Sequence, residues 1–253
     1  MPDVLVQALA QPGLYWILTA ALAAGLVRGF SGFGTAMVYL PIAGTFLSPF
    51  AALTTMLVMD FFGPLPNVPR ALRDRHPGDM SRLIMGLVIA LPLGVLVLTY
   101  VPTEVFRYAV SLIALTLLVL LISGFRYRGA LTPRLITGTG MLGGFLGGST
   151  GLPGPPVIML YMASTHPAHV VRATLMLYLL AVDVMMVGLF WLYDRLEPGF
   201  LMLGFCVMVP YLIGNVLGGW LFRPGYEKTY RGIAYLVIAI SAVMGLPFWT
   251  NGG

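Results

Sequence analysis

Long apolar stretches follow one another along almost the whole chain, and this succession constrains the fold more than any other feature. They cover residues 14–27, 35–48, 50–66, 83–101, 105–125, 135–148, 155–165, 170–193, 198–222 and 232–249. Several are long enough to span a hydrocarbon core of about 30 Å as helices, which rise about 1.5 Å per residue. The stretches are continuous, whereas the strands of membrane barrels alternate between apolar and polar residues. The sequence therefore predicts an all-α membrane protein.

The charged residues support this class and argue against a soluble protein. They make up 9% of the 253 residues, whereas a soluble domain carries about 25%. The net charge of +5 comes from Arg and Lys residues in short loops between the apolar stretches. This pattern is typical of cytoplasmic loops in membrane proteins. We therefore expect the lipid bilayer, and no nucleic acid, as a partner.

The sequence shows none of the residue groups that catalysis or metal binding needs. Cys206 is the single cysteine, so neither a disulfide nor a two-cysteine redox pair can form within the chain. No cluster of carboxylates or cysteines is evident around His76, His166 and His169, and Pro167 separates the last two. We expect no catalytic residue, no metal site and no cofactor, and we do not expect an enzyme.

Two of the apolar regions are interrupted by glycine-rich breaks. The first break, "RGFSGFGT", covers residues 28–35, and the second, "GGSTGLPG", covers residues 147–154. Non-helical backbone at membrane depth must form hydrogen bonds with protein or water, because lipid offers none. Each break is therefore expected to line a protein interior or a wet cavity, where its glycines permit a turn and a close backbone approach.

The two interrupted regions resemble each other and indicate an internal duplication. The aligned glycines are Gly25 with Gly144, Gly29 with Gly148, and Gly32 with Gly151. Asp60 and Asp183 each lie inside the next apolar stretch of their half. Duplication of this kind is typical of transporters. We predict an N-terminal tail at 1–12, repeat 1 at 13–125, a basic cytoplasmic linker at 126–133, repeat 2 at 134–249 and a C-terminal tail at 250–253.

The charges of the loops predict how the chain crosses the membrane. Three loops rich in Arg and Lys should be cytoplasmic, namely 67–82, 126–134 and 223–231, whereas "DRLE" at 194–197 should lie outside. An odd number of crossings must then separate 126–134 from 194–197. Residues 170–193 supply one crossing, so residues 135–165 must supply an even number. Two full crossings do not fit in so short a segment, which indicates a re-entrant hairpin that reaches mid-membrane depth.

Applied to both halves, this reasoning predicts two inverted repeats. Each consists of a re-entrant or broken-helix hairpin plus about three transmembrane helices. Because three crossings are an odd number, the second half has the opposite orientation and both termini lie outside. A single unbroken crossing at 135–165 would place the basic loop 223–231 outside, which the loop charges disfavour.

The two breaks are also the candidate substrate site. A helix that restarts after a break has unbonded N–H groups and a positive dipole end, which together favour an anion. Arg28 adds a fixed positive charge at a depth where charges usually serve a function. The candidate substrate-binding residues are Arg28, Ser31, Gly32, Phe33, Gly34 and Thr35 in the first break and Ser149, Thr150, Gly151 and Gly154 in the second.

Asp60, Asp183 and Arg172 are candidates for coupling or gating. Asp183 is interpreted as a proton or sodium site, and Asp60 either as such a site or as a structural partner of Arg28. Arg172 is either an anion gate or a cytoplasmic anchor. Two stripes of small residues at four-residue spacing are expected to be helix-packing faces, namely Ala21, Gly25 and Gly29 and, in the second half, Gly140, Gly144 and Gly148.

These motifs resemble the TauE/SafE family of sulfite exporters. The matching segments are "GLVRGFSGFGTAMVYLPIAG" (25–44) and "GFLGGSTGLPGPPVIMLY" (144–161), and the resemblance covers almost the whole chain. It implies that a small oxyanion such as sulfite, or a sulfonate such as sulfoacetate, crosses the bacterial inner membrane. One departure is "GLPGPP" (151–156), whose prolines remove N–H donors where an anion would need them. Substrate binding could therefore depend more on residues of the first repeat than on those of the second.

Together, the residues and the resemblance predict a multi-pass secondary transporter of the bacterial inner membrane. It would export a small sulfur oxyanion by alternating access around the paired breaks. The alternatives are an anion channel, a transporter of another small anion, or a membrane subunit without transport activity. The expected partners are a small anionic substrate and the bilayer, while proton or sodium coupling and a homodimer are open alternatives.

Overall fold

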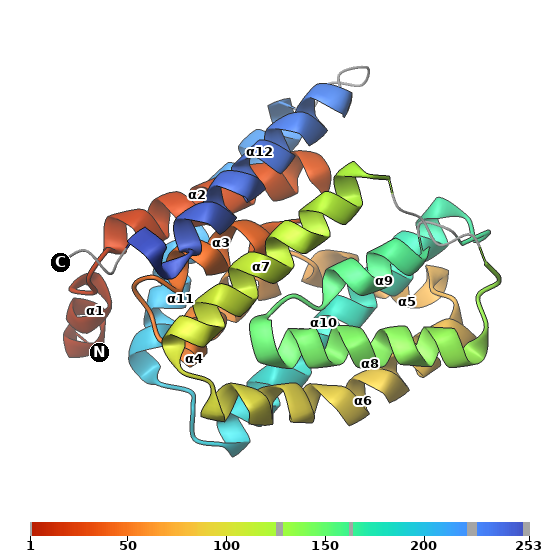
Figure 1. The fold of residues 1–253 in the computed structure, drawn as a ribbon, viewed down its shortest axis with the longest axis horizontal. Coiled ribbons are helices and arrows are strands. Elements are labelled where there is room, and N and C mark those ends of the chain that lie inside the picture. Colours follow the sequence, from red (N-terminus) through yellow and green to blue (C-terminus); the bar gives the residue numbers. More distant parts are fainter. Residues whose placement is uncertain (1, 125–128, 162–163, 222–226, 250–253) are drawn as a thin grey trace. The chain divides into compact units, whose positions relative to one another are not determined.

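The computed structural model describes residues 2–124, 129–161, 164–221 and 227–249, and it is helical along most of them (Figure 1). This confirms the predicted all-α class. Arg126, Arg128 and Arg223, which contribute to the predicted loop charges, and the tail 250–253 lie outside the described residues. Within the described part, five helices are long and apolar enough to cross a membrane, namely α2 (Leu14–Ser31), α6 (Pro77–Tyr100), α7 (Thr103–Ile122), α10 (Ala168–Leu192) and α11 (Pro198–Leu221).

The remaining helices are mostly shorter, and several begin where the sequence favours a start. Pro77, Pro133 and Pro198 each stand at the first position of a helix, where a missing N–H removes no hydrogen bond. The Thr132 hydroxyl caps the helix that follows it by accepting from the N–H of Leu135 at 3.3 Å. These remaining helices are α1 (Pro2–Leu9), α3 (Thr35–Ala43), α4 (Pro49–Phe61), η1 (Leu65–Asn67), α5 (Val68–Asp74), α8 (Pro133–Thr150), α9 (Gly154–Tyr161), α12 (Glu227–Gly245) and η2 (Pro247–Trp249).

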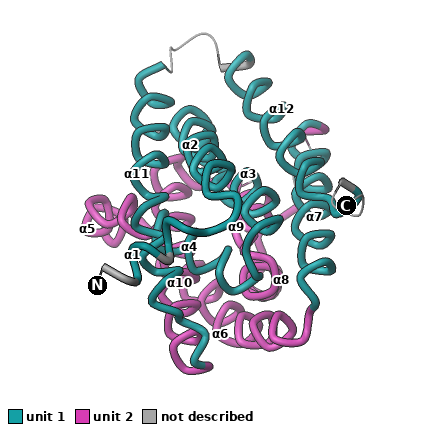
Figure 2. Tube along the Cα trace, turned by 90° about the vertical axis from the view of Figure 1, so that its left-hand side faces the viewer, with its two compact units in different colours: residues 1–60, 102–122, 194–253 teal, residues 61–101, 123–193 magenta. Residues whose placement is uncertain are grey.

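The helices form two compact units, each built from separate parts of the chain (Figure 2). Unit 1 contains residues 1–60, 102–122 and 194–253, and unit 2 contains residues 61–101 and 123–193. Each unit therefore combines a broken helix from one half of the sequence with a long helix from the other half. The boundaries of the two repeats and their inverted relation are not tested by this division and stay predictions.

In unit 1, helix α2 packs along α11 through its glycines. A Cβ atom added at Gly25 would collide with the backbone carbonyl oxygen of Tyr211, and one added at Gly29 would collide with that of Asn215. The contacts advance by four residues along both helices, so the two helices run parallel. Only glycine allows two helix backbones to approach this closely.

Helices α6 and α8 of unit 2 pack in the same way and lie side by side (Figure 1). A Cβ atom at Gly140 would lie 2.5 Å from the carbonyl oxygen of Leu83, and one at Gly148 would lie 2.5 Å from that of Leu91. These two helices are also parallel, since the contacts advance by eight residues along each. The interpretation of both stripes of small residues as helix-packing faces is confirmed.

Each broken helix turns back toward its own beginning. In unit 1, a Cβ atom at Gly13, just before α2, would collide with the ring of Phe46, which follows α3. In unit 2, α8 begins beside the first half of α6, and the chain after α9 returns to the start of α6. There the rings of His76 and His166 stack with their centroids 4.5 Å apart. Both returns agree with the predicted hairpins, whose position in a bilayer stays a prediction.

Candidate functional site

The first break connects α2 to α3 through left-handed glycines. Gly32 follows the last residue of α2 with φ at +78°, and Gly34 precedes α3 with φ at +98°. Backbone in this region strains any residue that has a side chain, so glycine is favoured at both positions. The Ser31 hydroxyl lies 2.5 Å from the carbonyl oxygen of Val27 and 2.8 Å from that of Phe33, and it accepts from the N–H of Phe33 at 3.3 Å. Ser31 therefore holds the shape of the break.

Arg28, in the last turn of α2, reaches across the break to α4 and to the start of α3. Its Nη1 donates to Oδ2 of Asp60 at 2.7 Å and to Oγ1 of Thr35 at 3.3 Å. The side chains of Arg28 and Asp60 are 23% and 21% exposed, so solvent only partly screens the pair. Asp60 is thus the partner of Arg28, which was one of its two predicted roles. Its role in coupling stays a prediction.

Tyr211 of α11 completes this network, and the sequence reasoning misses it. Its hydroxyl donates to Oδ1 of Asp60 at 2.6 Å and lies 3.5 Å from Oγ1 of Thr35. A signal was present in the sequence, because Tyr211 lies three and seven residues before Gly214 and Gly218. Residues with this spacing share one face of a helix, and here it is the face that contacts α2.

The start of α3 adds a second source of positive potential to the site. The carbonyl of Gly34 accepts from the N–H of Val38, and this is the first hydrogen bond of the helix ladder. The N–H groups of the first turn have no partner within the helix, and the helix dipole is positive at this end. Thr35 opens this turn and is 4% exposed. One guanidinium, one helix start and one carboxylate therefore meet at the first break.

The second break repeats the backbone geometry in unit 2. Helix α8 ends at Thr150, and Gly151 follows it with φ at +72°. The N–H of Gly151 donates to the carbonyl of Gly147 at 2.9 Å, and the next N–H, that of Leu152, donates to the carbonyl of Leu146 at 3.3 Å. The first of these bonds is that of an αL helix ending, in which glycine is favoured at the left-handed position.

The second break offers fewer hydrogen-bond donors than the first. Helix α9 begins at Gly154, and Pro155 and Pro156 in its first turn have no N–H group. The hydroxyls of Ser149 and Thr150 donate to backbone carbonyls one turn earlier in α8, at 2.7 and 2.8 Å. All four predicted substrate-binding residues of this break lie together, but its donor groups are less available to an anion.

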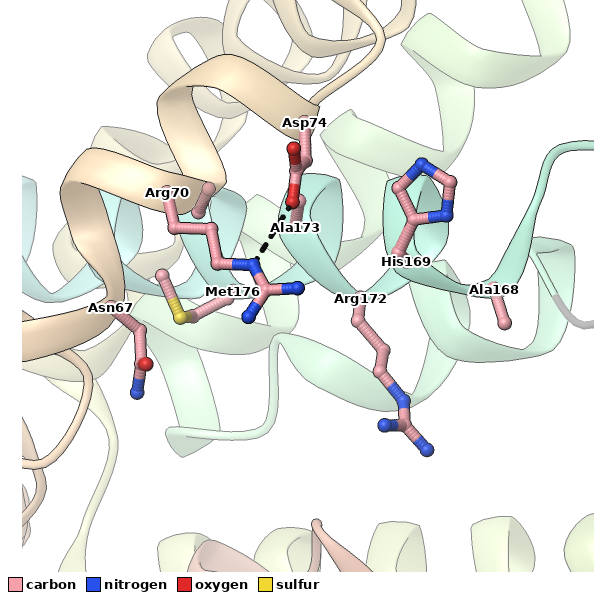
Figure 3. Close-up of a pocket in the computed structure, with 9 residues that line it drawn as sticks. Asn67, Arg70, Asp74, Ala168, His169, Arg172, Ala173 and Met176 are labelled. Carbon is pink, nitrogen blue, oxygen red and sulfur yellow. Dashed lines mark ion pairs between the residues drawn. The ribbon is translucent and has the colours of Figure 1, made fainter.

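The other two candidates lie elsewhere in unit 2. Asp183 is half-buried in the second half of α10. Arg172 is exposed and lines a pocket of about 430 Å³ between α5 and the start of α10. Figure 3 shows the ion pair of Arg70 with Asp74 in this pocket, 3.4 Å long, while Arg172 points away from that pair. The roles of Asp183 and Arg172 stay predictions.

The expectation that no carboxylate accompanies the histidines is wrong. Oδ1 of Asp79 lies 3.1 Å from Nδ1 of His76, and Oδ2 lies 3.2 Å from Nε2 of His166. His76 and Asp79 are three residues apart in the sequence, but His166 is 87 residues further along than Asp79, and only the fold brings it to them. His169 lies apart from this group and lines the pocket of Arg172.

The described residues form helices, several of them long enough to cross a membrane, with two hairpins broken at glycines and an arginine at one break. This combination is typical of membrane transport proteins. The family model described as sulfite exporter TauE/SafE matches residues 17–245. The chain belongs to this family, which confirms the resemblance found in the two motifs. No curated protein and no solved structure matches the chain.

Proposed function

We propose that this protein is a secondary transporter that exports sulfite or a small organosulfonate across the bacterial inner membrane. Membership of the sulfite exporter family supports a sulfur oxyanion as the substrate. One observation carries the choice of site: Arg28 lies at the first break within hydrogen-bond distance of Thr35, the first residue of α3. The positive charge of the guanidinium and the positive end of the α3 dipole therefore lie next to each other, where they can attract the same anion.

The geometry supports a separate role in this proposal for each polar group at the first break. A guanidinium presents its donors in a planar fork that fits two oxygens of one anion. Arg28 would bind two oxygens of the substrate, while the Thr35 hydroxyl and the first N–H groups of α3 would bind the third. Gly34, which has no side chain, leaves the backbone accessible. Ser31 supports the substrate indirectly, because its hydroxyl is engaged within the break.

The substrate would compete with Asp60 for Arg28. In the structure Arg28 is bound to the Asp60 carboxylate, which resembles a small oxyanion in charge and in the spacing of its oxygens. When substrate takes this position, Tyr211 continues to donate to Asp60 and keeps it in place. The displaced Asp60 carboxylate would lose its cationic partner, so binding adds negative charge to the site and Asp60 opposes it.

Export of an anion requires no coupling ion. An inside-negative potential favours outward movement of one negative charge by about 2.3 kcal/mol per 100 mV. Asp60 and Asp183 remain the candidates if a proton or sodium ion is coupled to transport. We place the basic segments in the cytoplasm, the two hairpins on opposite sides of the membrane and both termini outside. In this arrangement the movement of one half relative to the other would alternate access to the site.

Counterflow in liposomes tests this proposal. Purified protein is reconstituted, and the exchange of radiolabelled sulfite, sulfate and a small sulfonate is measured for the wild type, Arg28→Ala and the exposed-surface control Arg73→Ala. We expect saturable exchange of sulfite or the sulfonate that Arg28→Ala abolishes and Arg73→Ala retains. Flux that does not saturate, and that cooling barely slows, would indicate a channel. No flux of any of these anions would refute the proposed substrate class.

A further inference from the structure

Two histidines, one carboxylate and one tyrosine converge at the start of α6 in unit 2. His76 precedes α6 as its N-cap, and Asp79 lies in the first turn of that helix. His166 comes from the segment after α9, 87 residues further along the chain than Asp79. Tyr161 is the last residue of α9. None of these residues belongs to the anion site of the first break.

The ligand atoms of this cluster lie close together around a buried carboxylate. Nδ1 of His76 and Nε2 of His166 lie 3.1 and 3.2 Å from the two oxygens of Asp79. One ligand atom from each of the three residues lies within 4.8 Å of the others. The imidazole rings stack at an interplanar angle of 30°. Asp79 is only 3% exposed, so water screens its charge weakly.

One nitrogen of His76 contacts both the backbone and the side chain of Asp79. Its Nδ1 accepts from the backbone N–H of Asp79 at 3.2 Å, so in the neutral ring this nitrogen carries a lone pair and no proton. The same nitrogen lies 3.1 Å from Oδ1 of Asp79. Because Nδ1 has one lone pair, a metal ion on this nitrogen would replace the hydrogen bond from the Asp79 N–H and would lie beside Oδ1.

Two further side chains, those of Tyr161 and Arg82, would allow a cation to bind at the cluster. The Tyr161 hydroxyl is buried and has no hydrogen-bond partner within 3.5 Å among the described residues, and Asp79 and Arg82 are the charged groups near it. Arg82 approaches Oδ1 of Asp79 only at 3.4 Å, and its side chain is 37% exposed. An exposed arginine at this distance is able to move aside.

We propose that His76, Asp79 and His166 bind a divalent transition-metal ion, with Zn²⁺ as the reference ion. Two imidazole nitrogens and one carboxylate oxygen are the ligand set that Zn²⁺, Co²⁺ and Ni²⁺ prefer, whereas Mg²⁺ and Ca²⁺ prefer oxygen ligands alone. Bonds of about 2.0 Å in a tetrahedron separate neighbouring ligand atoms by about 3.3 Å. Each nitrogen lies at about this distance from one oxygen of Asp79, and the three ligand atoms, within 4.8 Å of one another, would have to approach each other to hold the ion.

A metal ion at this position would connect the second hairpin to a long helix. His76 and Asp79 belong to the start of α6, whereas His166 belongs to the return of the α8–α9 hairpin. The ion would therefore fix the end of that hairpin to α6 and stabilise unit 2. This inference depends on the cluster alone and holds whichever anion the protein transports.

Metal binding to the purified full-length protein, prepared without a histidine tag, tests the proposal. The variants are His166→Gln and His76→Asn, each of which removes one ligand, and asparagine retains the ability to cap α6. His169→Gln is the matched control, because His169 is exposed and lies three residues from His166 outside the cluster. Bound zinc per chain is measured by mass spectrometry, and Co²⁺ binding by its visible absorption.

We expect one zinc ion per chain in the wild type and in His169→Gln, together with a Co²⁺ spectrum typical of four-coordinate nitrogen and oxygen ligands. Zinc should also raise the thermal unfolding midpoint of both. Affinity should fall at least about tenfold in His166→Gln and His76→Asn, as expected for the loss of a ligand. The proposal is overturned if the wild type binds no zinc or cobalt, or if His166→Gln binds as tightly as His169→Gln. The midpoints without metal show whether each variant is folded.

Discussion

Arg28 and Asp60, each in an apolar helix and largely shielded from solvent, neutralise each other. Removal of one partner of such a pair leaves the other charge without compensation, which costs more than the pair itself contributes. In the proposed site, an anion on Arg28 would take over the compensation of the guanidinium, and Asp60 would keep only its hydrogen bond from Tyr211. The proposal therefore makes Asp60 both the residue that stabilises the arginine and the competitor of the substrate.

Replacement of Asp60 by Asn should strengthen anion binding. The competing charge is lost, while the amide remains able to accept from Tyr211, so about one charge-assisted hydrogen bond, or about 1.5 kcal/mol, no longer opposes the substrate. We expect an affinity about tenfold higher than that of the wild type, measured by equilibrium binding of labelled sulfite to purified protein. Asp74→Asn, which breaks the exposed pair with Arg70, is the control. Equal or weaker binding to Asp60→Asn would contradict the competition between Asp60 and substrate.

The sequence predicts a contact between two side chains most readily when both residues are unusual for the segment in which they stand. Arg28 and Asp60 are charges in apolar stretches, so their pairing was one of two stated alternatives. Tyr211 and the grouping of Asp79 with His166 were missed, because an aromatic residue in an apolar helix or a histidine in a loop is not unusual by itself. Their roles depend on which helices pack together, which residue type alone does not indicate.

Helices α2 and α8 each combine a glycine stripe with a left-handed ending, and both features were recognisable in the sequence. A stripe of small residues predicts that another backbone approaches closely, but not which one. The partners proved to be α11 and α6, each from the opposite half of the chain. The break after α8 lies beside Leu91 and Val95, which come after the middle of α6. The α8–α9 hairpin therefore extends past the midpoint of the helix on which it packs.

Gly148→Ala should destabilise the protein, whereas Gly138→Ala in the same helix should not. A Cβ atom at Gly148 would lie 2.5 Å from the carbonyl oxygen of Leu91, so α6 and α8 would have to separate. A Cβ atom at Gly138 meets open space, and alanine favours the helix by up to about 1 kcal/mol. Thermal unfolding midpoints in detergent should fall for Gly148→Ala and stay level or rise for Gly138→Ala. Equal midpoints would refute the close packing of these two helices.

The α8–α9 hairpin should leave both of its flanking segments on one side of the membrane. In a Cys206→Ser background, single cysteines are introduced at Arg73, before α6, at His169, after α9, and at Glu197, after α10. A membrane-impermeant thiol reagent should label positions 73 and 169 from the cytoplasmic side and position 197 from the outside, because only α10 crosses between the last two. Labelling of 73 and 169 from opposite sides would show that the α8–α9 segment crosses the membrane an odd number of times, which would refute a re-entrant hairpin.

At the scale of the whole chain, each unit is assembled from both halves of the sequence. The duplication predicted from the glycine motifs places one hairpin in each half, and each hairpin packs on a long helix of the other half. Neither half can therefore form its closest helix contact alone, which explains why the two halves are joined in one chain. Composition and hydropathy were sufficient to predict the helical membrane class, but this exchange of partners depends on long-range contacts that no local pattern encodes.

The central claim is that the first break binds the exported anion through Arg28. Equilibrium binding of labelled sulfite to purified protein tests it most directly, because binding does not depend on the movements that transport requires. We predict saturable binding in the wild type and in Arg73→Ala, with a loss of at least about tenfold in Arg28→Ala, since one charge-assisted hydrogen bond contributes about 1.5–3 kcal/mol. Binding by Arg28→Ala at the wild-type affinity would contradict the claim and direct attention to the second break.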